Sequence, residues 1–278
     1  MAAIYALLSA FSYGCADFLG GYSSRKNPPA AAVAWSQAAG LAAVLIAAPI
    51  IGSESVLLPD LLWGIAAGIS GAMGVLFLFT GLSRGMASIV SPLAALSGAV
   101  IPVIFGLAIG ERPPLLTWMG IAVALPSILL LSLESNDGGK TERSSLILGL
   151  TSGFFFGGFF ILISQSSDAS GMWPLAAARI ATVPLFAAAT GIMGRSLKLA
   201  RGTRRVTILS GVLDMAANVF YLLAFRGGYL ISAVILTALY PAPTVLLQRA
   251  VIGERLSAMR VSGLVLSIAA AALIGIGG

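Results

Sequence analysis

The chain of 278 residues is 58% hydrophobic and only 9% charged, and it contains no histidine and a single cysteine. An ordinary soluble domain carries about 25% charged residues, so this composition excludes a water-soluble globule and predicts an integral membrane protein. The missing histidine and the lone cysteine exclude histidine-based triads, histidine–cysteine metal sites and disulfide frameworks. The net charge is +6, but the basic residues lie in short loops between apolar stretches, which is typical of topology signals and not of nucleic-acid binding.

Ten predominantly apolar stretches follow one another along the chain, each close to the roughly 20 residues that a membrane-spanning helix needs. They cover residues 2–22, 30–51, 61–82, 87–109, 115–133, 145–164, 172–194, 206–226, 230–252 and 257–276. The first has no lysine or arginine before Phe11, so we interpret it as a retained helix and not as a signal peptide. The pattern predicts an all-α membrane protein of ten transmembrane helices, whose function is carried out within the bilayer.

The sequence repeats itself at an offset of 143 residues. The matched positions include Gly68 and Gly211, Gly110-Glu111-Arg112 and Gly253-Glu254-Arg255, and Gly120 and Gly263. We therefore predict two five-helix repeats, 1–135 and 145–278, joined by a linker at 136–144 into one membrane domain. Because five is odd, the second repeat enters the membrane from the opposite side. Inverted-topology pairs of this kind are typical of secondary transporters with a binding site at the midplane.

Most Lys and Arg residues fall in loops on one side of this predicted bundle. They are Arg25, Lys26, Arg84, Lys140, Arg143, Arg195, Lys198, Arg201, Arg204, Arg205, Arg249, Arg255 and Arg260. Arg112 and Arg226 fall on the other side, and Arg179 lies within a span. By the positive-inside rule the first side is cytoplasmic. We therefore expect a multi-pass protein of the plasma membrane, the inner membrane in a bacterium, with both termini outside the cytoplasm.

The repeated residues resemble a known family. Ser91-Pro92, Pro102 and Gly110-Glu111-Arg112, and again Leu239-Tyr240-Pro241 and Gly253-Glu254-Arg255, are similar to the EamA-type repeat. Over nearly its whole length the chain resembles a ten-span member of the drug/metabolite transporter superfamily. The resemblance implies that the first, third and fourth spans of each half line a central cavity and that the fifth and tenth spans pack outside it. It also implies a small metabolite as cargo, often an exported amino acid.

The first span departs from one branch of that superfamily. Small multidrug transporters carry a glutamate midway along this span, where the present chain has Tyr13 and Gly14, and Phe156 and Gly157 in the second half. The departure argues against the same proton-coupled cation chemistry, although Asp17 lies one turn further along.

Three ionisable residues inside spans require an explanation, because a charge within the membrane costs at least a few kcal/mol. Asp17 and Asp214 are expected in the half of the membrane near the basic loops, and Arg179 in the other half. In a functional interpretation they recognise the ammonium and carboxylate of a zwitterion, or an aspartate takes up a coupling proton. In the structural interpretation the aspartates pair with neighbouring arginines and Arg179 extends outward to the membrane surface.

Polar side chains recur with helical spacing in the eighth and ninth spans. The eighth carries Ser210, Asp214, Asn218 and Tyr221, and the ninth carries Thr237, Tyr240, Thr244 and Gln248. Such stripes face either a cavity or another helix, and both interpretations stay open. The matching positions of the first half are Gly71, Val75, Ala94 and Ile101, so we expect a cavity that is polar on one side only.

Aromatic residues in several spans are candidates for a stacking surface, or else they pack against lipid and other helices. They are Tyr13, Phe77, Phe156, Phe220, Tyr221 and Tyr240. Together with the polar residues they define a candidate substrate pathway of Tyr13, Asp17, Phe77, Phe156, Asp214, Asn218, Tyr221, Thr237 and Tyr240, with Arg179 as a candidate charge partner. Pro92 and Pro102 in the fourth span, and Pro241 and Pro243 in the ninth, are candidate hinges or static kinks.

The leading hypothesis is a secondary transporter that exports a small amphipathic metabolite, such as an amino acid, by alternating access around a midplane cavity. The alternatives are a broad-specificity exporter of lipophilic drugs and, from another class, a membrane-embedded enzyme or scaffold. No catalytic residue, metal site or cofactor is predicted, so we do not expect an enzyme. The expected partners are a small-molecule substrate and the lipid bilayer, with protons open as a coupling ion, no nucleic acid, and a monomeric chain.

Overall fold

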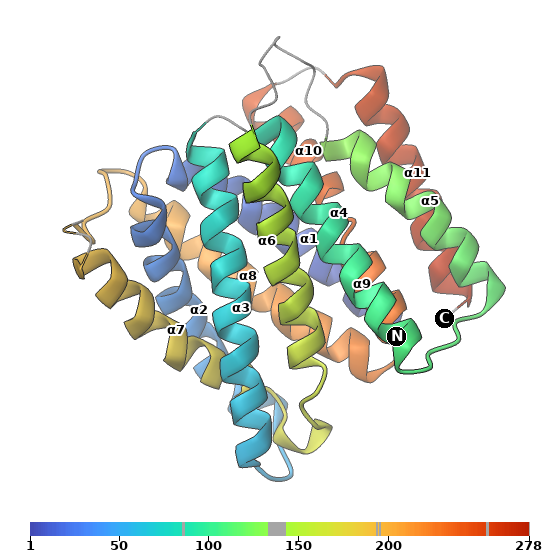
Figure 1. Cartoon of the computed structure of the whole chain (residues 1–278), viewed down its shortest axis with the longest axis horizontal. Helices are drawn as coiled ribbons and strands as arrows, with labels where there is room; N and C mark the ends of the chain where they lie inside the picture. Colours follow the sequence, from blue (N-terminus) through green and yellow to red (C-terminus); the bar gives the residue numbers. More distant parts are fainter. Residues whose placement is uncertain (85–86, 133–142, 193, 195, 254–255, 278) are drawn as a thin grey trace.

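The computed structural model describes residues 1–84, 87–132, 143–192, 194, 196–253 and 256–277, and within these residues it contains helices and no strands (Figure 1). The helices are α1 (Ala2–Ser24), α2 (Pro29–Ile51), α3 (Leu58–Ser83), α4 (Ala87–Ala108), α5 (Leu115–Ser132), α6 (Arg143–Ile163), α7 (Trp173–Ile192), α8 (Arg204–Arg226), α9 (Leu230–Thr237), α10 (Pro241–Leu247) and α11 (Ala258–Gly277), with a short 3₁₀ turn (Asp168–Ser170) and a π-helical turn (Gln248–Ile252). Nine described segments are long and apolar enough to cross a membrane, with Leu230–Val251 counted as one, and α5 is a shorter apolar helix. The predicted ten-helix fold class is therefore confirmed.

Glycine and proline set several of the helix boundaries. Pro29 stands in the first turn of α2, where its missing N–H would have no helical partner anyway. Gly110 follows α4 with a φ of +94°, and Gly253 follows the π-helical turn with a φ of +78°. These two glycines occupy matching positions of the two repeats, and only glycine adopts this left-handed backbone without strain. The other two residues of the second motif, Glu254 and Arg255, lie outside the described residues.

The two halves pack against each other in pseudo-symmetric pairs. Helix α1 lies on α8 as α6 lies on α3, and Figure 1 shows α5 beside α11 at one edge of the bundle and α2 beside α7 at the other. The hydroxyl of Ser9 donates to the carbonyl of Ala217 at 2.8 Å, and the hydroxyl of Ser152 donates to the carbonyl of Gly74 at 2.9 Å. Both donors and both acceptors are related by the 143-residue offset. The predicted linker 136–144 lies outside the described residues except for 143 and 144, which belong to α6.

The ninth predicted span, 230–252, is not one continuous helix. It consists of α9, a break at 238–240, α10 and the π-helical turn. Pro241 and Pro243 have no backbone N–H, so the carbonyls of Thr237 and Leu239 lose their usual helical donors. Tyr240 and Ala242 donate to these carbonyls instead, at 3.1 and 2.9 Å, which tightens the chain into turns. Its counterpart in the first half, α4, continues through both Pro92 and Pro102.

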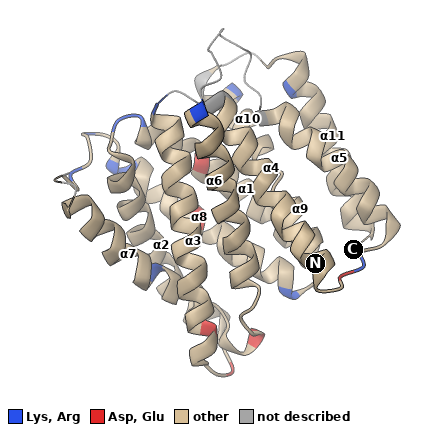
Figure 2. Cartoon of the chain, in the orientation of Figure 1, with Lys and Arg blue, Asp and Glu red and all other residues tan. Residues whose placement is uncertain are grey.

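Most charged residues in the described part of the chain lie at the two ends of the bundle, as Figure 2 shows. We call one end the basic end, since its loops and helix ends carry Arg25, Lys26, Arg84, Arg143, Lys198, Arg201, Arg204, Arg205, Arg249 and Arg260. Lys140, Arg195 and Arg255, which were predicted for the same side, lie outside the described residues. We call the other end the acidic end, where Glu54, Asp60, Glu111 and Asp168 lie with Arg112 and Arg226. Both termini lie at the acidic end, beside the loop between α8 and α9 (Figure 1).

Helices of the two halves cross at glycines that admit no side chain. A β-carbon on Gly211 of α8 would lie 2.2 Å from the carbonyl oxygen of Ser36 in α2. At the matching position in the first half, a β-carbon on Gly68 of α3 would lie 2.6 Å from the Cα of Ala178 in α7. Small residues that let helix backbones approach are a main source of stability in membrane bundles.

We predict that Gly211→Ala destabilises the protein by about 1–3 kcal/mol, because the added methyl group must push α2 and α8 apart. The measurement is the thermal unfolding midpoint of the purified protein in detergent. Gly191→Ala is the matched control, since no atom lies within 4 Å of its β-carbon position in α7. Equal midpoints for the two variants would show that the crossing tolerates the methyl group.

Candidate functional site

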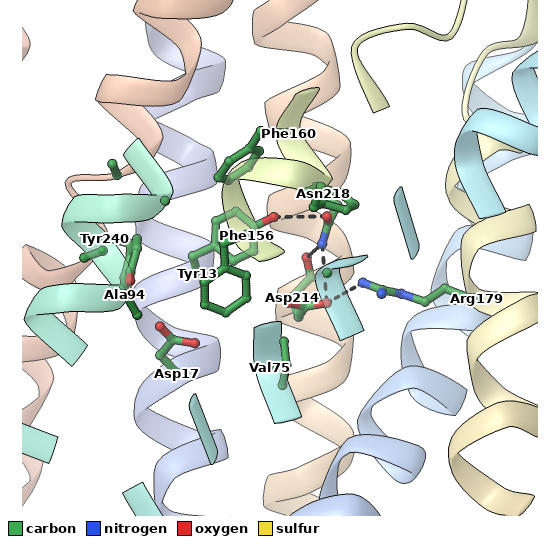
Figure 3. Close-up of a pocket in the computed structure, with 15 residues that line it drawn as sticks. Tyr13, Asp17, Val75, Ala94, Phe156, Phe160, Arg179, Asp214, Asn218 and Tyr240 are labelled. Atoms are coloured by element: carbon green, nitrogen blue, oxygen red, sulfur yellow. Dashed lines mark hydrogen bonds and ion pairs between the residues drawn. The ribbon is translucent and has the colours of Figure 1, made fainter. Parts of the chain in front are cut away.

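A small pocket lies at the centre of the bundle, between helices of both halves (Figure 3). Its lining residues come from α1, α3, α4, α6, α7, α8 and the break at 238–240. They are Tyr13, Asp17, Gly71, Val75, Ala94, Ala95, Gly98, Phe156, Phe159, Phe160, Arg179, Asp214, Asn218, Ala238 and Tyr240. Its volume is about 60 Å³, which is room for a few water molecules. We call it the central pocket.

The central pocket lies where the two repeats meet around their pseudo-symmetry axis. Several lining residues are matched across the 143-residue offset: Tyr13 with Phe156, Asp17 with Phe160, Gly71 with Asp214, Val75 with Asn218, and Ala95 with Ala238. In each of the first four pairs one member is polar and the other is not. The pocket therefore has a symmetric frame and an asymmetric chemistry. Its polar members come from both halves, however, whereas the sequence comparison of the halves predicted a cavity that is polar on one side only.

A buried ion pair forms one wall of the pocket. A terminal guanidinium nitrogen of Arg179 on α7 lies 2.5 Å from a carboxylate oxygen of Asp214 on α8, and the two side chains are only 5% and 19% exposed. The other terminal nitrogen donates to Oε1 of Gln37 on α2 at 2.5 Å, and the hydroxyl of Thr182 donates to the same oxygen at 3.1 Å. Arg179 thus neutralises Asp214 and joins three helices.

Hydrogen bonds extend this ion pair to the first helix. The amide nitrogen of Asn218 donates to the backbone carbonyl of Asp214 at 2.6 Å and lies 3.3 Å from its carboxylate. The hydroxyl of Tyr13 on α1 donates to the amide oxygen of Asn218 at 3.0 Å. The Tyr13 ring then meets the rings of Phe160 and Tyr240 edge-on, with centroids 6.4 Å apart in both cases. The dashed lines in Figure 3 trace this connection from Arg179 to Tyr13.

Asp17 has no such support. It lies one turn after Tyr13 on α1, and its carboxylate forms no hydrogen bond and no ion pair with any described residue. Figure 3 shows it apart from the bonded network, beside Tyr240. Of the two aspartates on the central pocket, Asp214 is compensated by protein groups and Asp17 is not.

A larger cavity opens from the central pocket toward the basic end, and we call it the vestibule. Its volume is about 590 Å³, and Asp17 and Tyr240 line both cavities. Three of its polar lining residues, Tyr240, Thr244 and Gln248, belong to the stripe predicted in the ninth span. Its charged lining residues are Asp17, Arg25 and Arg260. The central pocket is thus reached from the basic end past Asp17.

At the acidic end, polar bonds tie the two halves together. Asp60 at the start of α3 accepts hydrogen bonds from the hydroxyls of Ser167 and Ser170, at 2.5 and 2.6 Å. Glu111, in the turn after α4, accepts the backbone N–H groups of Leu230 and Ile231 at 2.8 and 3.0 Å, which caps the N-terminus of α9. These bonds fasten the acidic end. At the basic end the two halves are also joined, since Asn27 bonds to Thr203 and to the backbone N–H of Ala200, but there the vestibule opens between the helices.

The structure brings most, but not all, of the predicted residues to the pocket. Tyr13, Asp17, Phe156, Arg179, Asp214, Asn218 and Tyr240 line it. Phe77 instead stacks on Phe155, with centroids 5.8 Å apart. Tyr221 is fully buried and donates to the carbonyl of Phe160 at 3.2 Å, and Thr237 is also fully buried. Because the chain breaks at 238–240, Thr237 and Tyr240 no longer share a helix face, which separates Thr237 from the vestibule.

One sequence expectation about a charge is corrected. Arg179 does not extend to the membrane surface, since it is 4% exposed and its guanidinium is bonded to the carboxylate of Asp214. No described residue of α5 or α11, the fifth and tenth spans, lines the central pocket, as the resemblance implies, whereas Leu131 of α5 and Arg260 of α11 line the vestibule. The resemblance correctly places the first, third and fourth spans of each half around the central pocket.

Gln37 is the main residue that the sequence analysis missed. Its side chain is 1% exposed and holds Arg179 from the opposite side to Asp214. A lone amide within an otherwise apolar span was the available signal, because a polar group at this depth needs a partner.

Comparisons with known proteins were made for the whole chain. The model of the EamA-like transporter family matches twice, at residues 1–133 and 143–276. A solved crystal structure, described only as that of a protein, superposes with a TM-score of 0.80 at 17% identity, over 99% of this chain and 96% of the other. That likeness concerns the fold alone. None of the curated proteins matches the sequence.

We predict that the Arg179–Asp214 pair behaves as a coupled unit. Arg179→Met and Asp214→Leu should each cost about 3–5 kcal/mol, since each leaves one charge buried without its partner, whereas the double variant should cost much less than their sum. The measurement is a double-mutant cycle of thermal unfolding in detergent. Asp168→Asn is the control: this carboxylate is 75% exposed in its pair with Arg226, so the expected cost is below about 1 kcal/mol. Additive losses in the cycle would refute the coupling.

Proposed function

The chain belongs to the EamA-like transporter family and is a membrane transporter of the drug/metabolite transporter superfamily, and we propose that it exports small amphipathic metabolites, amino acids first among them. The observation that carries the proposal is the unpaired carboxylate of Asp17, at the junction of vestibule and central pocket. A carboxylate in this setting is costly until a cation reaches it. The primary ammonium of an amino acid is such a cation, and a proton is another.

The surroundings of Asp17 suit a substrate with an apolar body. Four aromatic residues line the central pocket: Tyr13, Phe156, Phe160 and Tyr240. Aromatic faces attract both apolar groups and ammonium ions. Asp214 already has Arg179 and is therefore not available to a substrate cation. We assign Asp17 the role of cation-binding residue. To Arg179, Asp214 and Asn218 we assign the positioning of Tyr13.

Cavity size supports a stepwise passage. Binding sites for small ligands usually measure about 300–1,000 Å³. The vestibule, at about 590 Å³, lies in this range, whereas the central pocket, at about 60 Å³, lies far below it. The substrate therefore meets Asp17 from the vestibule, and the central pocket widens only as the fastened end opens. In this alternating-access cycle the break at 238–240, followed by Pro241 and Pro243 in the first turn of α10, is the proposed hinge in the second half. Pro92 and Pro102 are the proposed hinge residues of the corresponding helix α4.

Charge distribution gives the proposed orientation. We place the protein in the plasma membrane. By the positive-inside rule its basic end faces the cytoplasm, and both termini then lie on the opposite, non-cytoplasmic side. The vestibule then opens to the cytoplasm, where an exporter loads its cargo. The second candidate function is export of lipophilic drugs, which the predominantly apolar lining of the central pocket favours.

The test is flux into liposomes that contain the purified protein, with a panel of aromatic, aliphatic and charged amino acids. Asp17→Asn should lower saturable flux by about tenfold or more, because a hydrogen bond to a charged group contributes about 1.5–3 kcal/mol. Cys15→Ala, on the same helix but on neither cavity, should transport like the wild type. An imposed pH gradient that drives the wild type but not Asp17→Asn would assign proton coupling to this residue.

Unchanged flux in Asp17→Asn would remove the residue from the mechanism. The second candidate function replaces the first if the protein transports no amino acid but does transport lipophilic drugs, and if chemically unrelated drugs compete with one another for transport.

Orientation is tested separately by labelling. In a Cys15→Ala background, we predict that Glu54→Cys reacts with a membrane-impermeant thiol reagent on intact cells and that Lys198→Cys reacts only after the membrane is permeabilised. Both positions are exposed, at opposite ends of the bundle. The reverse pattern would invert the proposed topology and make the vestibule open outward.

A further inference from the structure

The charges of the vestibule are arranged in order along its depth. Asp17 lies at the inner end, where the vestibule meets the central pocket, and Arg25 lies eight residues later, directly after the last residue of α1, at the exposed mouth. Arg260 of α11 supplies a second cation to the lining. A molecule entering from the basic end therefore passes a positive region first and reaches a negative charge last.

This order favours one class of solute and one orientation. Eight residues of helix rise about 12 Å, and an arginine side chain reaches back over several of them, so a small zwitterion fits between the two charges. Its lowest electrostatic energy has the ammonium inward at Asp17 and the anionic group outward at Arg25. Low-dielectric walls focus the field along the cleft and strengthen the preference.

The remaining polar groups are consistent with this arrangement. The Arg25 side chain forms no hydrogen bond or ion pair with the described residues, so it is available to an anion. The amide oxygen Oε1 of Gln248 is buried in the vestibule and has no hydrogen-bond partner among the described residues. A buried acceptor without a donor costs about 1–3 kcal/mol, which an ammonium passing along the vestibule relieves.

We propose that the vestibule selects zwitterions and admits them ammonium first, with Arg25 as the specificity-determining residue for the anionic group. The proposal rests on the proposed function and narrows its substrate class. An amine without a carboxylate still has Asp17 but meets only repulsion at the mouth. An N-acylated amino acid is attracted at the mouth but has no cation for Asp17.

The test compares three solutes that share one aromatic side chain: phenylalanine, phenethylamine and N-acetylphenylalanine. In liposomes that contain the wild-type protein, transport of phenylalanine should have the lowest KM of the three solutes. Arg25→Gln should raise the KM of phenylalanine about fivefold and leave that of phenethylamine unchanged or lowered, so that the preference for the zwitterion is lost. The matched control is Arg84→Gln, which removes the same charge at the same end from a residue that lines neither cavity.

The outcomes separate the two levels of proposal. Wild-type transport of phenylalanine with an unchanged preference in Arg25→Gln overturns the role of Arg25, while the proposed function stands. An equal loss of flux for all three solutes in Arg25→Gln also overturns it, because that result indicates a structural role. Absence of saturable flux for every solute in the wild type overturns the proposed function, and the zwitterion proposal with it.

Discussion

A charge inside a membrane protein must find an opposite charge or a hydrogen-bonded substitute, and the structure depends on how this requirement is met at two aspartates. Asp214 is neutralised by Arg179, which is in turn held by Gln37, so the protein itself satisfies the requirement. Asp17 has no protein partner in the described structure. The first arrangement makes a rigid wall from α2, α7 and α8. The second leaves a site whose most favourable state includes a cation from outside the chain, which is the physical basis of the proposed transport role.

The repeat explains why such an asymmetric site can exist in a symmetric frame. Hydrogen bonds from Ser9 and Ser152 and the close crossings at Gly68 and Gly211 occur in both halves, and they hold helices in place without adding charge. The polar residues of the pocket lack this symmetry: Phe160 matches Asp17, and Gly71 matches Asp214. The same packing contacts therefore hold the helices in both halves, while only one residue of each of these matched pairs in the pocket is polar.

Hydropathy and the repeat predict most of the fold, because each span must satisfy its backbone internally and bury or expose apolar surface over a known length. They also identify the glycines that end α4 and the π-helical turn. The pocket is less predictable, since its membership depends on side-chain reach and on helix phase. Arg179 pairs with Asp214 although residue counting assigned the two to different halves of the membrane, and the break after Thr237 removes Thr237 and Tyr240 from a common helix face. Neither effect is visible in an ideal helical projection of the sequence.

The same break connects the fastened end of the molecule to the candidate site. Glu111 of the first half caps α9 of the second, and α9 is buried along its whole length of about 12 Å. Its C-terminal end leads directly into Ala238 and Tyr240, which line the central pocket beside Asp17. In the proposed alternating-access cycle, release of the cap at one end of α9 displaces Tyr240 at the other. A short helix bounded by a side-chain cap and a proline-containing break would then couple opening of the acidic end to widening of the central pocket.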